Sequence, residues 1–108
     1  MAQRNVVRRP AARRDLAEAV RYLRREGGAA LSNRFLDEVE VTFMQLCSFP
    51  NMGTSWPTLR PELVGLRRRL LPHFPYSLFY LPSEQTIEIV RVLHNSRDIS
   101  PLLEDLGS

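Results

Sequence analysis

The spacing of apolar residues divides this chain into a helical half and a strand-like half. Residues 11–26 and 29–49 each place apolar side chains three and four positions apart, which is the period of an amphipathic helix. Gly27 and Gly28 separate the two stretches, so the pattern predicts two antiparallel helices joined as a hairpin. The apolar stripes consist of Leu16, Ala19, Val20 and Leu23 in the first helix, and of Leu31, Phe35, Val39, Phe43 and Leu46 in the second.

Short apolar runs bounded by proline predict the strands. Residues 4–9 form a first strand that Pro10 ends, and residues 63–74, 75–82 and 85–94 form three later strands in a meander. The stretch 50–61, with three prolines and a glycine, is predicted to be a loop. A short last helix begins with Ser100 as its N-cap and Pro101 at its first position. The predicted fold is α+β with the order β-α-α-β-β-β-α, a helical hairpin packed on a mainly antiparallel sheet.

Apolar residues are predicted on both faces of the last two strands. A sheet face that met water would alternate with polar residues, and the helical hairpin can cover one face only. We therefore expect the short last helix, together with a bound partner segment, to cover the other face. In strand 75–82, alternation assigns Tyr76, Leu78 and Tyr80 to one face and Phe79 and Leu81 to the other. In strand 85–94, it assigns Ile87, Ile89 and Leu93 to one face and Val90 and Val92 to the other.

Length and composition indicate one ordered globular domain over residues 1–108. The chain is 44% hydrophobic and 25% charged, with no biased tract that would mark disorder. It shows neither a signal-peptide core nor a run of 18 apolar residues, so we expect a cytoplasmic protein without membrane contact. Cys47 is the only cysteine, which excludes an internal disulfide and a cysteine metal cluster. We expect Cys47 to pack within a helix, and we expect no metal or cofactor.

Positive charge is concentrated in the first helix. All 15 basic residues are arginine, and residues 1–25 contain eight of them against Asp15 and Glu18, a net charge of +6. Residues 63–97 carry +3, whereas residues 26–62 and 98–108 carry −3 each. This distribution suggests an acidic partner, either nucleic acid or an acidic protein segment.

The ordered set of elements resembles a known family. The stretches YLRREGGAALSNRFLDEVEVTFMQLCSFPNMG, LRRRLLPHFPYSLFYLP and IEIVRVLHNSRD look like the ParE/RelE superfamily of type II toxins. The aromatic strand, the hairpin and the run Arg-Val-Leu-His-x-x-Arg-Asp are more similar to the ParE branch than to the RelE branch. The resemblance covers nearly the whole chain.

The resemblance implies a toxin that binds and inhibits DNA gyrase without being an enzyme, held inactive by a cognate antitoxin. The alternative that it leaves open is a RelE-like endoribonuclease that cuts mRNA on the ribosome. A third possibility is an inactive homologue that only binds an antitoxin. For the free protein, monomer and homodimer both stay open, and a higher-order toxin–antitoxin complex is expected.

Candidate site residues follow from the strands and their ends. Nuclease chemistry would need a general acid, a general base and cations, for which the candidates are Arg67, Arg69, Arg91, His94 and Arg97. Arg91 and His94 lie three positions apart, so a regular strand would point them to opposite faces. No tyrosine follows Tyr80, so the late tyrosine of some RelE-like sites has no counterpart. The predicted binding residues for target or antitoxin are Arg67, Arg69, Tyr76, Leu78, Tyr80, Arg91, His94 and Arg97.

Structural roles compete with these functional ones. Arginines 67–69 can simply flank a solvated strand, and His94 can be a hydrogen-bonded residue at a strand end. Asp98 can cap the last helix or pair with Arg97. His73 is expected to be exposed in a proline-flanked turn, and Trp56 to pack beneath its loop.

Overall fold

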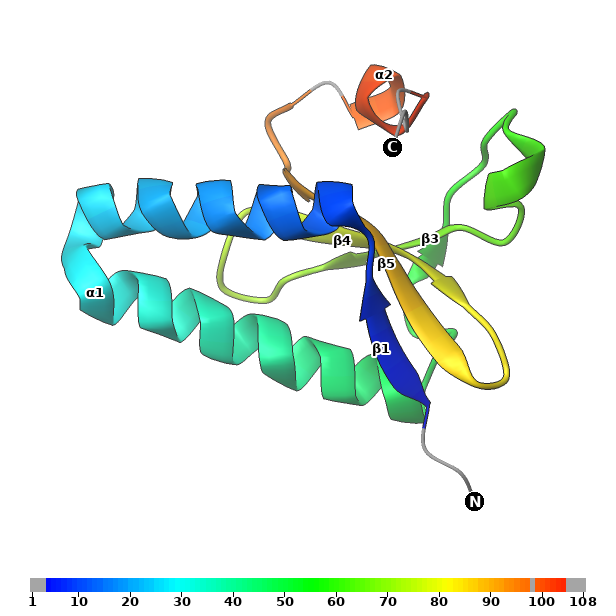
Figure 1. Ribbon diagram of the computed structural model, residues 1–108, viewed down its shortest axis with the longest axis horizontal. Helices are drawn as coiled ribbons and strands as arrows, with labels where there is room; N and C mark the ends of the chain where they lie inside the picture. Colours follow the sequence, from blue (N-terminus) through cyan, green and yellow to red (C-terminus); the bar gives the residue numbers. More distant parts are fainter. Residues whose placement is uncertain (1–3, 98, 105–108) are drawn as a thin grey trace.

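The structure is a computed structural model that describes residues 4–97 and 99–104, and it has the predicted α+β class. A broken helix packs on one face of a sheet, and a short helix lies against the other face (Figure 1). The elements are β1 (Asn5–Arg8), α1 (Pro10–Ser48), β2 (Thr54–Ser55), the 3₁₀-helix η1 (Pro61–Leu63), β3 (Arg67–Leu70), β4 (Tyr76–Pro82), β5 (Thr86–His94) and α2 (Ile99–Glu104).

The helical hairpin is confirmed, as a single element α1 broken at Gly27–Gly28. Gly28 has a φ of 77°, in the left-handed region that side chains disfavour. A Cβ at Gly27 would lie 2.6 Å from the Cδ2 atom of Leu31, so a larger residue would collide there. Both positions therefore favour glycine, and the two arms, residues 10–26 and 29–48, lie side by side (Figure 1).

Within the described residues, the sheet has five strands in the order β1-β5-β4-β3-β2. The meander of β3, β4 and β5 is antiparallel as predicted, and β1 pairs with β5 in parallel. Two predictions were wrong in detail. Residues 50–61 are not all loop, because Thr54 and Ser55 pair with β3. The predicted strand over residues 63–74 is formed only at Arg67–Leu70, and Leu63 lies in η1.

The main core lies between α1 and one sheet face. Both arms contribute the predicted stripes, although Val20 and Leu31 are only partly buried. The strands contribute Tyr76, Leu78 and Tyr80, the set that alternation assigned to one face. Cys47 packs against this cluster from α1, as expected. The fully buried members of this core include Phe35, Leu46, Leu78, Tyr80, Ile87 and Ile89.

A second core covers the opposite sheet face, which corrects the expectation that a partner must cover much of it. Phe79, Val90 and Leu93 are buried there beneath Ile99 and Leu103 of α2. The loop before β3 adds Leu63, Leu66 and the partly buried Trp56, which indeed packs beneath its loop. The chain thus covers most of this face with its own segments, and Leu81 is among the residues left partly exposed.

A β-bulge changes the face assignment in β5. Phe79 pairs with Arg91 while the next residue, Tyr80, pairs with Ile89, so Val90 is the extra residue. The bulge reverses the alternation beyond it. Val92 therefore joins the core under α1 and Leu93 joins the second core, the opposite of the predicted assignment.

The last helix begins at Ile99, one residue before the predicted N-cap Ser100. Asp98, the alternative cap, lies outside the described residues.

Candidate functional site

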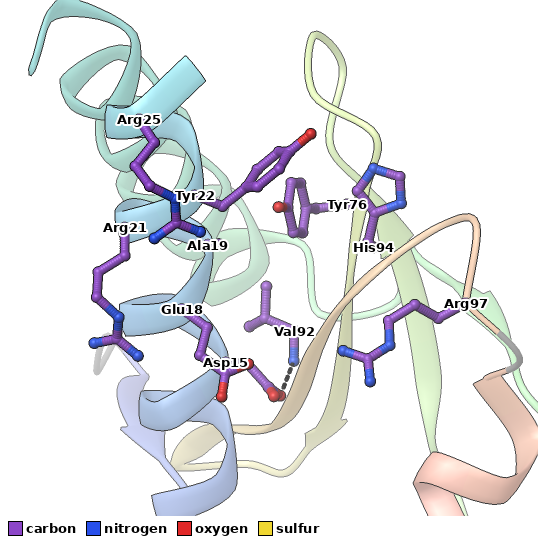
Figure 2. A pocket seen from close by; sticks show the side chains of 10 residues that line it. All are labelled: Asp15, Glu18, Ala19, Arg21, Tyr22, Arg25, Tyr76, Val92, His94 and Arg97. Atoms are coloured by element: carbon purple, nitrogen blue, oxygen red, sulfur yellow. Dashed lines mark hydrogen bonds between the residues drawn. The ribbon is translucent and has the colours of Figure 1, made fainter. Parts of the chain in front are cut away.

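A pocket of about 340 Å³ opens between the first arm of α1 and the ends of β4 and β5 (Figure 2). Cations, carboxylates and aromatic rings all contribute to its walls. The lining residues are Asp15, Glu18, Ala19, Arg21, Tyr22 and Arg25 from α1, Tyr76 from β4, Val92 and His94 from β5, and Arg97 from the turn that follows.

Helical periodicity builds one wall of the pocket. Asp15, Glu18, Ala19 and Tyr22 are spaced by three and four residues, so they share the face of α1 that looks toward the sheet. Arg21 and Arg25, four apart, extend along the outer side of the same wall (Figure 2). The sequence thus brings two carboxylates, a phenol and two guanidinium groups to one rim.

The opposite wall is aromatic. Tyr76 and His94 are direct partners in the β4–β5 register, and their rings meet edge to face with centroids 5.0 Å apart. Burial, and secondarily the neighbouring Tyr22, raises the pKa of Tyr76 above its ordinary value of 10.0. Its hydroxyl, which is protonated at neutral pH even at the ordinary pKa, is thus harder still to ionise and can donate a hydrogen bond.

The ring of His94 is oriented by the turn that follows it. Its Nδ1 atom accepts a hydrogen bond from the backbone N–H of Ser96 at 3.1 Å, and the hydroxyl of Ser96 lies 2.8 Å from the same nitrogen. In the neutral ring the proton is then on Nε2. The turn thereby positions both His94 and Arg97 at the pocket.

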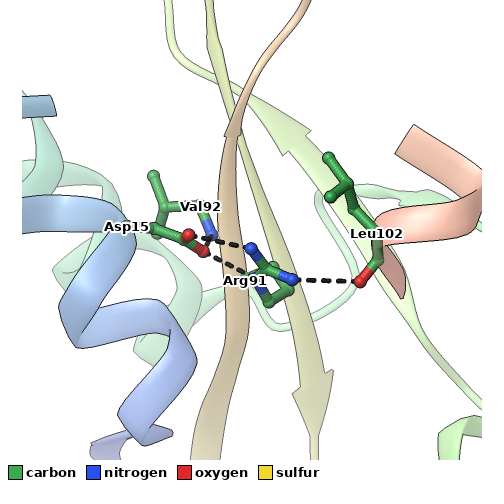
Figure 3. Close-up of polar contacts among 4 residues, drawn as sticks. All are labelled: Asp15, Arg91, Val92 and Leu102. Carbon is green, nitrogen blue, oxygen red and sulfur yellow. Dashed lines mark hydrogen bonds and ion pairs between the residues drawn. The ribbon is translucent and has the colours of Figure 1, made fainter. Parts of the chain in front are cut away.

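The contact between Asp15 and Arg91 connects three elements at the pocket (Figure 3). Arg91 donates from Nε and Nη2 to the two carboxylate oxygens at 2.7 and 2.9 Å, a bidentate pair whose side chains are 13% and 9% exposed. The backbone N–H of Val92 also donates to Asp15 at 2.9 Å, and Arg91 Nη1 donates to the carbonyl of Leu102 in α2 at 3.0 Å. This contact joins α1, β5 and α2, so Arg91 has a structural role that sequence reasoning missed.

The three arginines of β3 divide between the sheet faces as alternation predicts. Arg67 and Arg69 pair with Tyr80 and Leu78 on the α1 side, and Arg68 pairs with Phe79 on the other. The guanidinium of Arg67 donates to the carbonyls of Gly53, at 2.6 Å, and Asn51, at 3.0 Å, so it holds the loop after α1.

Arg68 and Arg69 have different surroundings. Arg68 lies over the rings of Trp56 and Phe79, at 5.2 and 5.7 Å, and donates to the hydroxyl of Ser77 at 2.9 Å. Among the described residues, the buried Nε atom of Arg69 has no hydrogen-bond partner. Neither arginine lines the pocket.

The structure brings together only part of the predicted site. Tyr76, His94 and Arg97 line the pocket, whereas Arg67 and Arg69 lie elsewhere on the sheet. Leu78 and Tyr80 are 0% exposed beneath α1, so the expectation that they face a partner is corrected for both. The bulge precedes Arg91 and therefore does not turn it toward His94. Of the five nuclease candidates, His94 and Arg97 meet at the pocket, and Arg67, Arg69 and Arg91 do not line it.

Sequence reasoning missed the helical half of the pocket. Asp15, Glu18 and Tyr22 are separated from His94 by most of the chain, and no local pattern links them. The one available signal was the excess of arginine in residues 1–25, which pointed to this arm without showing what it faces. His73, which is exposed as expected, contacts Glu38 at 2.7 Å and lies outside the pocket.

Two further observations concern the described part of the chain. Within residues 4–97 and 99–104, no three His, Cys, Asp or Glu side chains gather in a way that could hold a metal ion. None of the helices described there is long and apolar enough to cross a membrane.

Comparisons with known proteins identify the family. The sequence profile described as "ParE toxin of type II toxin-antitoxin system, parDE" matches residues 6–99. Among curated protein sequences, none matches this chain.

Solved structures show the same fold. A chain of the chromosomal ParDE toxin–antitoxin system from P. aeruginosa superposes with a TM-score of 0.68 at 18% identity, covering 85% of this chain and 96% of that one. A chain of the RelBE2 toxin–antitoxin complex from Mycobacterium tuberculosis superposes with a TM-score of 0.55 at 27% identity, covering 90% and 97%. Because the family profile spans most of the sequence, the chain belongs to the ParE toxins of type II toxin–antitoxin systems.

Proposed function

We propose that this ParE-family toxin acts by binding DNA gyrase and that a cognate antitoxin neutralises it. The family match supports the toxin class. The choice of gyrase over the ribosome is supported by one observation above all, the engagement of Arg91 with Asp15 and Leu102. A guanidinium held in this way is not free to stabilise a phosphorane, which a ribonuclease site would require.

The remaining ribonuclease candidates support the same choice. Arg67 donates to loop carbonyls and does not line the pocket. The pocket offers His94 and Arg97, but Tyr76 beside them stays protonated. Of the cations predicted for a ribonuclease site, Arg97 is the one that lines the pocket beside His94.

The pocket between α1 and β5 is our proposed binding site for an acidic segment of the antitoxin. Asp15 already forms an ion pair with Arg91. Among the residues that line the pocket, Glu18 is then the other carboxylate beside three arginines, Arg21, Arg25 and Arg97. The solved neighbours are themselves toxin–antitoxin complexes. Arginine pairs well with carboxylates, and the rings of the opposite wall provide apolar contact for an anchoring side chain.

A RelE-like activity remains the second candidate, because a RelBE2 chain shares 27% identity with this one over most of both chains. In that alternative Arg67, Arg91, His94 and Arg97 would be catalytic. It requires Arg91 to leave Asp15 when the ribosome binds.

The decisive experiment assays purified toxin in parallel for inhibition of gyrase supercoiling and for cleavage of mRNA on ribosomes. We expect inhibition of supercoiling without cleavage. If cleavage is found, His94→Gln should lower its rate by roughly 100-fold or more, as loss of an acid or base does. The matched control His73→Gln alters an exposed histidine outside the pocket. Cleavage that falls with His94→Gln and not with His73→Gln would replace the proposed function by the second candidate.

A further inference from the structure

Arginine side chains form a stripe along the outer side of the first arm of α1. At about 100° of turn per residue, they fall within an arc of about 120° around the helix axis, over a rise of about 18 Å. Ala17 shares this arc, and Glu18 lies at its edge, on the side of the pocket. The members of this arginine stripe are Arg13, Arg14, Arg21, Arg24 and Arg25.

The arginine stripe faces solvent on a rigid support. All of its members are exposed, and Figure 2 shows Arg21 extending from the arm away from Tyr76 and His94. The opposite side of the arm packs in the main core. The backbone that carries the guanidinium groups is therefore fixed, and the spacing of the charges along the arm is fixed with it.

The charges of the stripe are not neutralised within the described part of the chain. In residues 4–97 and 99–104, none of its side chains forms an ion pair or a hydrogen bond. Asp15 pairs with Arg91 instead. Like charges four positions apart, such as Arg21 and Arg25, destabilise a helix. The stability of the fold therefore does not explain the stripe.

The arginine content of the chain does not explain it either. All 15 basic residues are arginine, so composition accounts for the residue type. Composition does not account for the placement, because the second arm, residues 29–48, contains Arg34 as its one arginine against three acidic residues. The two arms of one hairpin thus differ in charge, and the positive charge lies on the first.

The chemistry of the stripe favours a duplex phosphate backbone as its ligand. A protein segment would need apolar anchors, and Ala17 supplies the one apolar side chain on the arc. Single-stranded nucleic acid would need aromatic side chains for stacking, and between residues 13 and 25 the arc contains none. An anionic membrane would need an apolar helix face, but that face of the arm is in the core. A duplex presents phosphates, about ten of them over about 18 Å of its axis.

A second copy of this chain fits the stripe less well than a duplex does. The acidic residues of the second arm are Asp37, Glu38 and Glu40. Glu38 already contacts His73, and Glu40 already pairs with Arg8. A second copy would therefore have to break two of its own contacts to neutralise the stripe.

We infer that the arginine stripe binds the phosphate backbone of a nucleic-acid duplex, without reading its sequence. Arg13, Arg14 and Arg24 lie outside the pocket beside α1, and Arg21 and Arg25 belong to both surfaces. Under the proposed function the duplex is DNA held by gyrase, and that assignment rests on the proposed function. The binding itself needs the toxin and a duplex alone.

The test measures binding of the purified toxin to a short DNA duplex by fluorescence anisotropy over a series of salt concentrations. The triple variant Arg13→Ala/Arg14→Ala/Arg24→Ala removes the members of the stripe that lie outside the pocket. Each phosphate contact contributes roughly 0.9 to the slope of log affinity against log salt, so we expect this slope to fall by roughly 2.7 and the affinity at low salt to weaken roughly tenfold or more. The melting temperature should not fall, because alanine is a good helix former.

Two controls separate position from charge. Arg24→Ala and Arg34→Ala each remove one exposed arginine from α1, and Arg24 is the one that belongs to the stripe. Arg24→Ala should lower the slope by roughly 0.9, and Arg34→Ala should leave it unchanged. The triple lysine variant at positions 13, 14 and 24 keeps the charges and should retain most of the affinity. Equal effects of Arg24→Ala and Arg34→Ala would show that binding follows net charge alone, which overturns the inference.

An RNA duplex in the same assay identifies which source of phosphate the stripe accepts, and loss of either duplex by the triple variant supports the inference. Unchanged duplex binding by that variant overturns it. So does tighter binding of wild type to single-stranded DNA or to phosphatidylserine vesicles, or a loss of self-association by the triple variant on sedimentation, which would assign the stripe to a second copy.

The outcome is separable from the proposed function, because the duplex is assayed without gyrase. A toxin that binds the duplex through the stripe but does not inhibit supercoiling refutes the proposed function and supports this inference. A toxin that inhibits supercoiling but binds no duplex does the reverse.

Discussion

Single polar groups hold the loop after α1 in place. The hydroxyl of Tyr80 donates to the carbonyl of Pro50 at 2.7 Å and accepts the backbone N–H of Gly53 at 3.0 Å. Arg67 holds the carbonyl of Gly53 from the other side. The glycine is needed for close approach, because a Cβ there would lie 2.7 Å from both the Tyr80 hydroxyl and the carbonyl oxygen of Arg68.

We predict that Tyr80→Phe destabilises the protein by about 1–3 kcal/mol, because it leaves the N–H of Gly53 and the carbonyl of Pro50 without this partner. Urea denaturation measures the difference in the free energy of unfolding. Tyr22→Phe is the matched control, since it removes the same atom from a residue that is 46% exposed. Equal effects of the two changes would contradict this account of the loop.

Most of the elements could be predicted from the proline and glycine residues at their ends and from the spacing of their apolar residues. Pro10 and the pair Gly27–Gly28 mark the ends of β1 and of the first arm, and the apolar stripes identify the buried sides of both arms. The bulge beside Tyr80 could not be predicted, because the run Ile-Val-Arg-Val-Leu is apolar in either register. The parallel pairing of β1 with β5 could not be predicted either, because it joins segments that are far apart in the sequence.

The candidate site was predictable only where it lies on a strand end. His94 and Arg97 follow an apolar run, which makes them visible as polar residues near a sheet edge. The contribution of Asp15 depends on how α1 crosses β5. Neither the helical period nor the charge pattern contains that information.

For the contacts between elements, we predict that loss of the ion pair between α1 and Arg91 greatly lowers the free energy of unfolding. Asp15→Asn should lower stability by roughly 3–5 kcal/mol, because it leaves a buried guanidinium without its counter-charge. Adding Arg91→Met should restore part of the loss. A double-mutant cycle from chemical denaturation measures this coupling.

The exposed pair of Arg8 and Glu40, with side chains 43% and 62% exposed, provides the control for that cycle. Glu40→Gln should cost about 1 kcal/mol or less, since solvent screens the pair. Strictly additive effects of the Asp15 and Arg91 changes would show that the buried pair does not couple the elements.

On the scale of the whole molecule, charge is segregated. Residues 1–25 carry +6 and the following 26–62 carry −3, so the first arm of α1 forms a positive flank beside the pocket. Such a flank accelerates the approach of an acidic partner, and salt weakens the effect.

We predict that Arg21→Ala/Arg25→Ala weakens antitoxin binding by roughly 0.5–2 kcal/mol at low salt and flattens the dependence of the affinity on salt. Titration calorimetry at two salt concentrations measures both quantities. Arg34→Ala is the control, because it removes an exposed arginine from the second arm, outside this pocket. A salt dependence that survives in the double variant would place the acidic contact elsewhere.

The parallel pairing of β1 with β5 has a consequence for synthesis on the ribosome. The first strand is made at once, but its only sheet neighbour among the described strands comes at Thr86–Ile89. Contacts that close so long a stretch of chain form late, because the entropy of loop closure must be overcome first. A growing chain therefore holds α1 without a finished sheet, and neither the pocket nor the second core exists until β5 has emerged. The pocket proposed here as the antitoxin site therefore cannot form before residues 86–94 have been synthesised.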